Sequence, residues 1–348
     1  MASTGSDPVL ETLLLPFADG VLTRPEVPAL FLRARDGWPL RQFPLRQLVC
    51  EQSFKPDADG LAKAGLEVVA EIAASSQRFS HVLVLPPRQR DEMRALFARA
   101  VSLAAPGGVV VACLANDEGA KSGESDLQEL AGPGGKLTRN HCRVFWTAPL
   151  HGTHDAELLA QWLALDAPRS ILDGRFVSRP GVFAWDRVDA ASALLAECLP
   201  RDLSGVGADL GAGYGFLSTE ILVHNPQVAA LHLYEAEARA LDCARRNLAP
   251  FAGKAELDFR WHDATAGLPD RYDFIVSNPP FHATRKAGRP DIGQRFIAVA
   301  AEALKPGGRL WLVANRHLPY EQVLDANFGR VRVVAGRDGF KVVEAVKA

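Results

Sequence analysis

The second half of the chain alternates short apolar runs with longer segments of helical periodicity. The apolar runs are bounded by glycine, proline or acidic residues, which is typical of buried strands, and they cover 205–210, 228–233, 272–277 and 309–315. Leu257, Phe259 and Trp261 alternate with polar residues, which predicts a further strand. Residues 216–224 and 237–249 have the spacing of amphipathic helices. Strands that alternate with helices predict right-handed βαβ units and a parallel sheet.

The end of the chain departs from this alternation. A helical pattern over 291–304 is followed by Pro306-Gly307-Gly308, which we expect to close the helix. A second helix is predicted within 318–329. Two strand patterns, 330–336 and 340–346, are then separated by a short turn that contains Asp338-Gly339. This is a hairpin signal, and it predicts an antiparallel strand at the end of the sheet.

The first half contains strand and turn motifs that resemble those of the second half. "HVLVLPPRQ" resembles "DFIVSNPPF", and "APGGVVVACLAN" resembles "KPGGRLWLVAN". We interpret this as a duplicated domain, with a first domain over 1–165 and a second over 166–348. The alternative is that any two α/β domains share a helix, a Pro-Gly-Gly turn and a strand. The first copy has "ALFLRARDGWPL" where a glycine-rich turn is expected, and its "LPPRQ" lacks the Asn and the Phe of the second copy.

Composition narrows the class of protein. A chain of 348 residues with 48% hydrophobic and 23% charged residues is an ordinary globular protein of about two domains. A formal net charge of −2 gives no global argument for nucleic-acid binding, so such binding would rest on local patches. No apolar run approaches the roughly 18 residues of a membrane span, and the start of the chain lacks the pattern of a secretory signal. Scattered cysteines favour reduced thiols, a cytoplasmic location and no metal site: Cys50, Cys113, Cys142, Cys198 and Cys243.

A glycine-rich turn follows the first predicted strand of the second half. Asp209 precedes Gly211, Gly213 and Gly215, and glycines at such a turn let a ligand approach the backbone at the next helix. Glu235 ends the following strand, where an acid is placed to accept hydrogen bonds from a ribose. The alternative is a glycine turn that only packs a helix on a strand.

Two further residues bear on the choice of ligand. Phe216 stands where the dinucleotide fingerprint requires a third glycine, which disfavours an NAD-dependent oxidoreductase. Asp263 follows the third strand and could accept a hydrogen bond from an adenine amino group, although many such residues are turn or cap residues.

The sequence "YDFIVSNPPFH" ends the fourth predicted strand in an unusual way. Proline cannot donate to a sheet ladder, so the strand must stop at Ser277. Asn278 brings a side-chain carbonyl, and Pro279 brings a backbone carbonyl that is free to accept. Two acceptors can hold the two hydrogens of an amine, while Phe281 offers a flat face for stacking. The pattern therefore predicts a site for a planar group with an exocyclic amine.

These motifs carry a family resemblance. "DLGAGYG", "YEA", "HDA" and "SNPPFH" resemble class I S-adenosylmethionine-dependent methyltransferases that act on amines. With "FVSRPGVFAWDRVDAAS", "VANRHLPYEQVLDANFG" and "GFKVVEA", the chain resembles the bacterial family that methylates the guanine N2 amine of 16S ribosomal RNA in the small subunit. The resemblance implies an α/β fold of two tandem Rossmann-like domains, each a seven-stranded, mostly parallel sheet with an antiparallel terminal hairpin. It also implies that the first domain is degenerate and serves RNA binding or stability.

The resemblance implies roles for individual residues. Asp209, Gly211, Gly213, Glu235, Asp263 and Asn278 would bind S-adenosylmethionine, with Glu235 on its ribose and Asp263 on its adenine. Asn278 and Pro279 would receive the target amine, and Phe281 would stack on the guanine. No metal is expected, because the sulfonium methyl group is already activated.

Contact with ribosomal RNA, in the small subunit or an assembly intermediate, must be local. The nearest basic cluster follows the pocket motif and contains Arg285, Lys286, Arg289 and Arg295. A second set lies in the first domain, at Arg88, Arg90, Arg94 and Arg99, and for both sets a solvated helix face is the alternative.

Other functions stay open at this point. The sister family that acts on large-subunit RNA shares "NPPFH" and "NRHL". The same chemistry serves methylation of a protein glutamine amide or of an adenine amine. A different class is a non-catalytic RNA-binding assembly factor, which the presence of Asp209, Glu235 and Asn278 argues against.

Overall fold

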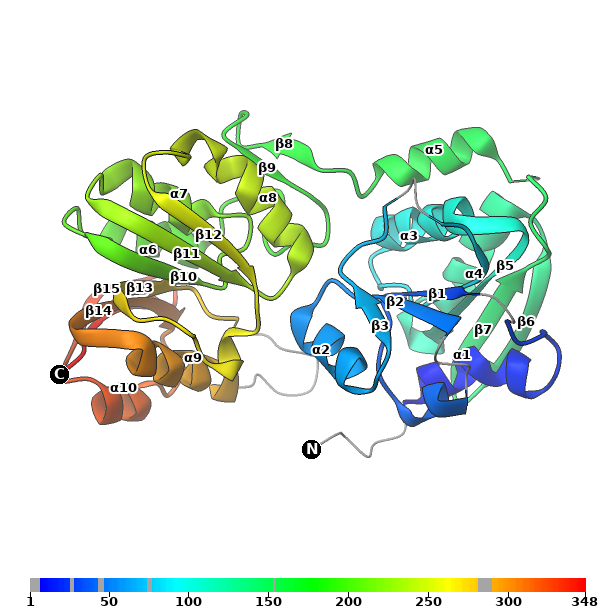
Figure 1. Ribbon diagram of the computed structural model, residues 1–348, viewed down its shortest axis with the longest axis horizontal. Coiled ribbons are helices and arrows are strands. Elements are labelled where there is room, and N and C mark those ends of the chain that lie inside the picture. The colour runs from blue at the N-terminus through cyan, green and yellow to red at the C-terminus, as the bar shows by residue number, and fades with distance from the viewer. Residues whose placement is uncertain (1–6, 26–27, 43–46, 74–76, 153, 281–289) are drawn as a thin grey trace. The chain divides into compact units, whose positions relative to one another are not determined.

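The computed structural model describes residues 7–25, 28–42, 47–73, 77–152, 154–280 and 290–348. The chain divides into two compact units, Met1–Ala167 and Pro168–Ala348, and each contains one seven-stranded sheet (Figure 1). The tandem α/β fold predicted from the sequence is confirmed. None of the helices in the described ranges is long and apolar enough to cross a membrane.

The second unit contains the predicted parallel sheet, with strand order β12-β11-β10-β13-β14-β16-β15. Neighbours from β12 to β14 pair in parallel, whereas β16 is antiparallel to both β14 and β15, as the hairpin pattern predicts. The strands are β10 (Gly205–Leu210), β11 (Val228–Glu235), β12 (Glu256–Trp261), β13 (Tyr272–Ser277), β14 (Leu304–Asn315), β15 (Arg330–Arg337) and β16 (Phe340–Val346).

Helices cover both faces of this sheet (Figure 1). Apolar side chains of α6 (Ala190–Cys198), α7 (Phe216–His224) and α8 (Ala238–Leu248) belong to one buried cluster. Those of α9 (Pro290–Ala303) and α10 (Glu321–Asn327) belong to another. Two short 3-10 helices, η4 (Ala249–Phe251) and η5 (Ala264–Ala266), and a two-stranded sheet of β8 (Arg169–Ile171) and β9 (Phe176–Ser178) complete the unit.

The first unit has the same topology, with strand order β3-β2-β1-β4-β5-β7-β6. Its strands are β1 (Ala29–Leu32), β2 (Leu48–Glu51), β3 (Glu67–Val69), β4 (Phe79–Val84), β5 (Ala104–Ala115), β6 (Gly134–Arg139) and β7 (Cys142–Thr147). Its helices are α1 (Pro8–Ala18), α2 (Lys55–Lys63), α3 (Arg90–Leu103), α4 (Ala120–Ala131), α5 (Ala156–Ala164) and the 3-10 helices η1 (Trp38–Gln42) and η3 (Asn116–Glu118). The second sheet order is therefore a repeat of the first.

The Pro-Gly-Gly motif differs from its prediction, because it does not cap a helix. Helix α9 ends at Ala303 and β14 begins at Leu304, so the motif lies inside the strand. Tyr272 pairs with Leu304 and Phe274 with Arg309, which leaves residues 305–308 as a bulge. A Cβ on Gly308 would lie 2.8 Å from the Lys305 carbonyl oxygen. Glycine is needed here for a tight bulge, and the turn residues alone do not distinguish a bulge from a helix end.

Candidate functional site

The register of two neighbouring strands places the glycine turn beside the Asn-Pro-Pro segment. Leu210 at the end of β10 pairs with Ser277 at the end of β13. The Ser277 hydroxyl also donates a hydrogen bond to the Leu210 carbonyl, at 2.8 Å. In parallel α/β sheets ligands bind at this carboxyl edge, where the strand order reverses. Both predicted motifs therefore leave the sheet side by side.

The three glycines of the turn are used differently. All have positive φ, with +76° at Gly211, +57° at Gly213 and +89° at Gly215. A Cβ on Gly215 would lie 2.6 Å from a methyl carbon of Leu248, so this glycine permits close packing of α7 on α8. A Cβ on Gly213 would meet nothing within 4 Å. The backbone at Gly213 is therefore open to a ligand.

Glu235, the last residue of β11, is bonded to this turn. One carboxylate oxygen accepts the backbone N–H of Gly213 at 2.7 Å, and the other accepts that of Glu237 at 2.8 Å. Burial raises the pKa of Glu235, and the two backbone N–H groups act against that rise. Each carboxylate oxygen has a second lone pair, so the group can hold the turn and still accept hydroxyl groups of a ligand.

Asp209 lies in β10, two residues before Gly211, and is fully buried. Its Oδ2 accepts the Ser218 hydroxyl at 2.7 Å, whereas Oδ1 has no partner among the described residues. Burial raises the pKa of Asp209 to about 7, and the nearby Glu235 charge adds to the rise. The side chain is not among those that line the cleft described below.

Asp263 follows β12 and caps η5. Its Oδ1 accepts both the backbone N–H of Thr265 at 2.9 Å and the Thr265 hydroxyl at 2.7 Å. Because Glu235 pairs with Trp261 across β11 and β12, Asp263 lies at the same edge of the sheet as Glu235. The capping role that the sequence left as an alternative is thus present, and Oδ2 is not used by it.

Asn278 has the most informative geometry of the site. Its Nδ2 donates to Asp189 Oδ2 at 3.0 Å and to Ser192 Oγ at 2.8 Å. Its Oδ1 is buried and has no hydrogen-bond partner in the described part of the chain. A buried polar atom without a partner is costly in a native protein unless a ligand satisfies it. The amide oxygen is therefore a candidate acceptor for a bound group.

A cleft lies between the glycine turn and Asn278. It is lined by the turn from Gly211 to Tyr214, the start of α7, Asn278, the helix start at Asp189 and Ser192, and the loop residues Phe183 and Ala184. The Phe183 side chain at the rim of this cleft is 66% exposed. Pro279 is buried next to Asn278. The structure thus gathers Gly211, Gly213 and Asn278 in one place, with Glu235 one hydrogen bond away.

The sequence analysis did not single out Asp189 or Ser192. Asp189 is the N-cap of α6 and accepts the Ser192 backbone N–H at 2.9 Å. A helix start was readable in "RVDAAS", because an Asp before an Ala-rich helical run is a common N-cap. Its contact with Asn278 was not readable, since it depends on how α6 lies on the sheet.

Four residues that the sequence predicted for the site, Phe281, Arg285, Lys286 and Arg289, lie outside the described residues. Arg295 of α9 donates to the Thr265 carbonyl at 2.9 Å and pairs with Glu302 at 3.3 Å. In the first unit, Arg90 and Arg94 bind the buried Asp126, with the Arg90 and Arg94 Nη2 atoms at 2.8 and 3.0 Å from its Oδ1. Arg99 makes a bidentate pair with Glu51, at 2.8 and 2.7 Å. These three arginines therefore form ion pairs within the first unit, whereas Arg88 is exposed.

The first unit shows what has replaced the glycine turn. Leu32 pairs with Val84 as Leu210 pairs with Ser277, so Arg33 corresponds to Gly211 and Leu85 to Asn278. Arg33 still has a positive φ of 52°. The first unit therefore keeps the backbone form of the turn but has neither its open glycines nor the amide.

Gln52 occupies the position of Glu235. Its Oε1 accepts the N–H of Phe54 at 2.9 Å, just as Glu235 accepts that of Glu237, but its Nε2 donates to the Ala34 carbonyl at 2.7 Å. A neutral amide that donates to the turn has replaced a carboxylate that accepts from it. The acid expected at a ribose is absent from this position of the first unit.

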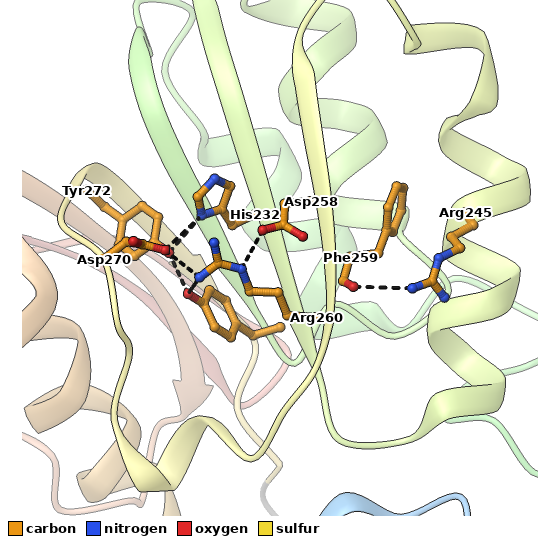
Figure 2. A network of polar contacts seen from close by, with 8 residues as sticks. His232, Arg245, Asp258, Phe259, Arg260, Asp270 and Tyr272 are labelled. Atoms are coloured by element: carbon orange, nitrogen blue, oxygen red, sulfur yellow. Dashed lines mark hydrogen bonds and ion pairs between the residues drawn. The ribbon is translucent and has the colours of Figure 1, made fainter. Parts of the chain in front are cut away.

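A polar network braces the strands beside the second-unit site (Figure 2). Arg260 of β12 donates to Asp258 at 2.6 Å, to Asp270 and to the Tyr234 hydroxyl. Tyr234 and Tyr272 share a hydrogen bond of 2.6 Å, and His232 contacts the Tyr272 hydroxyl at 2.9 Å. Burial lowers the pKa of His232, and the Arg260 charge lowers it further. The network links the ends of β11 and β12, which lead to Glu235 and Asp263, with Tyr272 at the start of β13.

Two aromatic side chains of the neighbouring strands differ in burial. Tyr272 is fully buried. Trp261 is partly exposed, and its indole N–H donates to the Ala236 carbonyl at 2.9 Å. Trp261 therefore packs at the margin of the core cluster and is bonded to the loop after Glu235.

Comparisons with known proteins agree over most of the chain. Residues 173–344 match the model of the methyltransferase small domain family. The chain is 29% identical over 323 residues to ribosomal RNA small subunit methyltransferase C of Shewanella baltica, covering 82% of this chain and 91% of the relative. It is 31% identical over 264 residues to the protein of that name from Salmonella paratyphi A, covering 75% of this chain and 73% of the relative.

A solved structure has the same fold. It is a T. thermophilus 16S rRNA N2 guanine methyltransferase in complex with AdoMet and guanosine. The TM-score is 0.79 at 24% identity, and the match covers 99% of this chain and 93% of that chain. The match covers both units, so each of the two sheets has a counterpart in that structure.

Proposed function

This chain belongs to the ribosomal RNA small subunit methyltransferase C family, and we propose that its second unit transfers a methyl group to the N2 amine of a guanine in 16S ribosomal RNA. The family makes the chain an S-adenosylmethionine-dependent ribosomal RNA methyltransferase. The choice of guanine N2 is supported by the T. thermophilus protein, which was solved with guanosine. The observation in this chain that carries the proposal is the buried, unpartnered Oδ1 of Asn278 beside an open glycine turn.

The residues at the turn fit S-adenosylmethionine. Gly211 and Gly213 leave room for a ligand against the backbone, and Glu235 is held where a ribose diol could donate to it. Asp263 has a carboxylate oxygen available for the adenine amino group. S-adenosylmethionine, when bound, supplies a methyl group already activated on a sulfonium, so the proposal involves no metal ion. Asp209 sits deeper and would support the turn through Ser218.

Asn278 and Pro279 would hold the target amine. The lone pair of a guanine amine is delocalised into the ring, so the amine is a weak nucleophile. A hydrogen bond from each N–H to a carbonyl, one on Asn278 and one on Pro279, would orient the lone pair toward the methyl group. These acceptors would also stabilise the positive charge that develops on nitrogen, which is the part of the interaction that accelerates the reaction. Stacking of Phe281 on the base stays a prediction.

The RNA must present the guanine unpaired. A paired N2 amine is occupied, so the base must be in a single-stranded segment or flipped from its helix. We propose that the substrate is small-subunit RNA, free or within an assembly intermediate, and that the protein acts in the cytoplasm. Arg285, Lys286 and Arg289 stay the predicted phosphate contacts, because phosphate binding needs cations near the pocket.

We assign the first unit to RNA binding or to stabilisation of the chain, without a cofactor. Support comes from Gln52 in place of the acid, Leu85 in place of the amide, and Arg33 in place of the first glycine. The internal ion pairs of Arg90, Arg94 and Arg99 favour a structural role for that face of α3.

Mapping the methylated nucleoside tests the proposed function. The protein is incubated with cofactor labelled in its methyl group and with 16S RNA, small subunits, 23S RNA or a total protein fraction. The RNA is then digested, and its nucleosides are separated. We expect labelled N2-methylguanosine from small-subunit RNA. Label in 23S RNA, in adenine or in protein would instead support one of the alternatives and contradict the proposal.

A further inference from the structure

We propose that Asp189 and Ser192 are positioning residues, which fix the Asn278 amide so that its oxygen is left for the target amine. The inference concerns residues that no comparison assigns. It rests on the proposed function only for the role of Asn278 itself. Neither residue needs to touch the substrate, because each would act through the hydrogen bonds to Asn278 Nδ2.

The oxygen and the NH2 group of an asparagine amide have nearly the same shape, but the NH2 group only donates hydrogen bonds and the oxygen only accepts them. A rotation of the amide by half a turn would exchange the two, and Asn278 would then present N–H groups where an acceptor is required. A group that recognises one end must therefore hold the amide.

Asp189 supplies that recognition. Its carboxylate can only accept, and its Oδ2 lies 3.0 Å from Asn278 Nδ2. In the reversed orientation two oxygen atoms would face each other, which is repulsive. Ser192 accepts the second hydrogen at 2.8 Å, so both N–H bonds of the amide are used. The only atom of the amide left for another group is Oδ1, which is buried without a partner among the described residues.

The two positioning residues are themselves held by one helical turn. Asp189 caps α6 and accepts the Ser192 backbone N–H through the same Oδ2, at 2.9 Å. Ala191, Leu194 and Leu195 of this helix are buried in the core cluster beneath it. The carboxylate therefore cannot swing away from Asn278 without loss of its cap bond.

The first unit provides an internal comparison. Asp7 caps α1 there as Asp189 caps α6, and its Oδ1 accepts the N–H groups of Val9 and Leu10. By position, Leu10 corresponds to Ser192 and Leu85 to Asn278, and both leucines are buried in one apolar cluster. Where the amide is absent, the serine is absent too.

The aspartate in the first unit has a different second partner. Asp7 Oδ2 forms an ion pair with Arg35 at 3.0 Å, where Arg35 corresponds to Gly213. A helix cap alone therefore needs neither a serine at this position nor an amide opposite the carboxylate. We therefore infer that Ser192, and the contact of Asp189 with Asn278, orient the Asn278 amide and are not needed to cap the helix.

The pair also changes the electronic character of the amide. A hydrogen bond from an amide N–H to a charged carboxylate is stronger than one between neutral groups. Donation at Nδ2 draws electron density toward the carbonyl, so Oδ1 becomes a better acceptor. This effect grows in importance as positive charge develops on the amine.

Asp189→Asn separates positioning from capping. Asparagine is as good an N-cap as aspartate, so a residue that serves only the helix should tolerate this change. A positioning residue should not, because the oxygen that caps the helix also accepts from Asn278, and in asparagine that oxygen lacks the charge that strengthens the bond. Asp155→Asn is the matched control, since Asp155 caps α5 in the first unit and accepts the Leu158 N–H at 2.9 Å.

The test is a comparison of single-turnover methyl transfer to small-subunit RNA, with cofactor affinity, RNA affinity and thermal stability measured on the same full-length proteins. We expect the Asp189→Asn rate to fall by about 5- to 10-fold, as a charged hydrogen bond becomes a neutral one, while both affinities stay within about three-fold of the parent. Ser192→Ala, which leaves Asp189 in place, should lose roughly five-fold. Asp155→Asn should match the parent in every measurement.

A double-mutant cycle identifies the route of the effect. If Asp189 acts through Asn278, Asp189→Asn should add less than about two-fold to the loss already caused by Asn278→Ala.

A parent-like methyl-transfer rate for Asp189→Asn would overturn the inference. So would a double variant whose loss of rate equals the product of the losses in Asp189→Asn and Asn278→Ala. Should Asp189→Asn be too unstable to assay, Ser192→Ala and its own cycle with Asn278→Ala decide in the same way. These failures are distinct from a failure of the proposed function, which would appear as a parent protein that does not methylate guanine.

Discussion

Glu235 accepts a hydrogen bond from the backbone N–H of Gly213 at 2.7 Å, which joins the acid at the end of β11 to the glycine turn after β10. The turn is thereby held in the form that leaves Gly213 open. In the first unit Gln52 reverses the direction of the bond and donates to the turn. The two turns therefore differ in the direction of this hydrogen bond and in the charge of the residue that makes it.

Glu235→Gln should weaken cofactor binding more than it weakens folding. The amide cannot accept both backbone N–H groups and also accept ribose hydroxyls, and hydrogen bonds to a charged group are worth about 1.5–3 kcal/mol. We expect cofactor affinity to fall by roughly 10- to 100-fold in calorimetry. Glu256→Gln, at the exposed start of β12, is the control and should bind like the parent. An unchanged affinity for Glu235→Gln would mean that another acid binds the ribose.

Gly213→Ala should affect the ligand, whereas Gly215→Ala should affect the fold. Alanine at positive φ costs about 1–2 kcal/mol, and at Gly213 the added Cβ enters open space in the cleft. At Gly215 it would also collide with Leu248, so a larger loss of unfolding free energy is expected. Gly339→Ala is the matched control, because Gly339 has a φ of +83° and open space but lies in the β15–β16 turn.

The measurements for this set are urea unfolding and cofactor calorimetry. Gly213→Ala and Gly339→Ala should lose similar stability, and only Gly213→Ala should also lose cofactor affinity. If both bind the cofactor equally well, the open backbone at Gly213 is not part of the site.

The whole chain should bind one equivalent of S-adenosylmethionine. The second unit has the glycine turn and Glu235, and the first has Arg33, Gln52 and Leu85 in the matching places. Calorimetry on the full-length protein measures the stoichiometry directly. Two equivalents per chain would show that the first unit has kept a cofactor site.

Asp209 should make the stability of the cofactor-free protein depend on pH. Its folded-state pKa is raised to about 7 because it is buried, so the folded form binds a proton more tightly than the unfolded form does. Its contribution is therefore fully favourable below about pH 4 and is lost as pH rises to about 7. Asp209→Asn removes this titration.

The comparison with Asp209→Asn isolates this group from all others. The difference in unfolding free energy, variant minus parent, should increase from pH 4 to pH 7 by up to a few kcal/mol and then level off. Urea unfolding at a series of pH values measures it. A difference that is flat with pH would show that Asp209 has an ordinary pKa in the folded protein.

Much of the second unit was predictable, because local patterns decide it. The prolines after Ser277 end β13, and the hairpin signal at Asp338-Gly339 gives β15 and β16. The Pro-Gly-Gly prediction was wrong in its detail, since glycine serves a tight bulge as well as a helix end. Periodicity specifies which elements form, whereas the conformation of a short turn depends on the strand that it passes.

The partners of the site residues could not be predicted in this way. Asp189 and Asn278 are 89 positions apart, and their contact requires that the start of α6 lie next to the residue that follows β13. The Tyr234–Arg260–Tyr272 network likewise requires the order of three strands. The sequence did not identify Gln52 as the counterpart of Glu235, because the first half retains little of the motif spacing. The strand register identifies it.

The central claim is that Asn278 accepts a hydrogen bond from the guanine amine as charge develops on nitrogen. The measurement is single-turnover methyl transfer from labelled S-adenosylmethionine to small-subunit RNA by Asn278→Ala, alongside equilibrium RNA and cofactor binding. We expect the rate to fall at least about 100-fold, since a hydrogen bond to a developing charge is lost together with alignment. RNA affinity should stay near that of the parent, because phosphate contacts dominate it. Methyl transfer by Asn278→Ala at the parent rate would contradict the account.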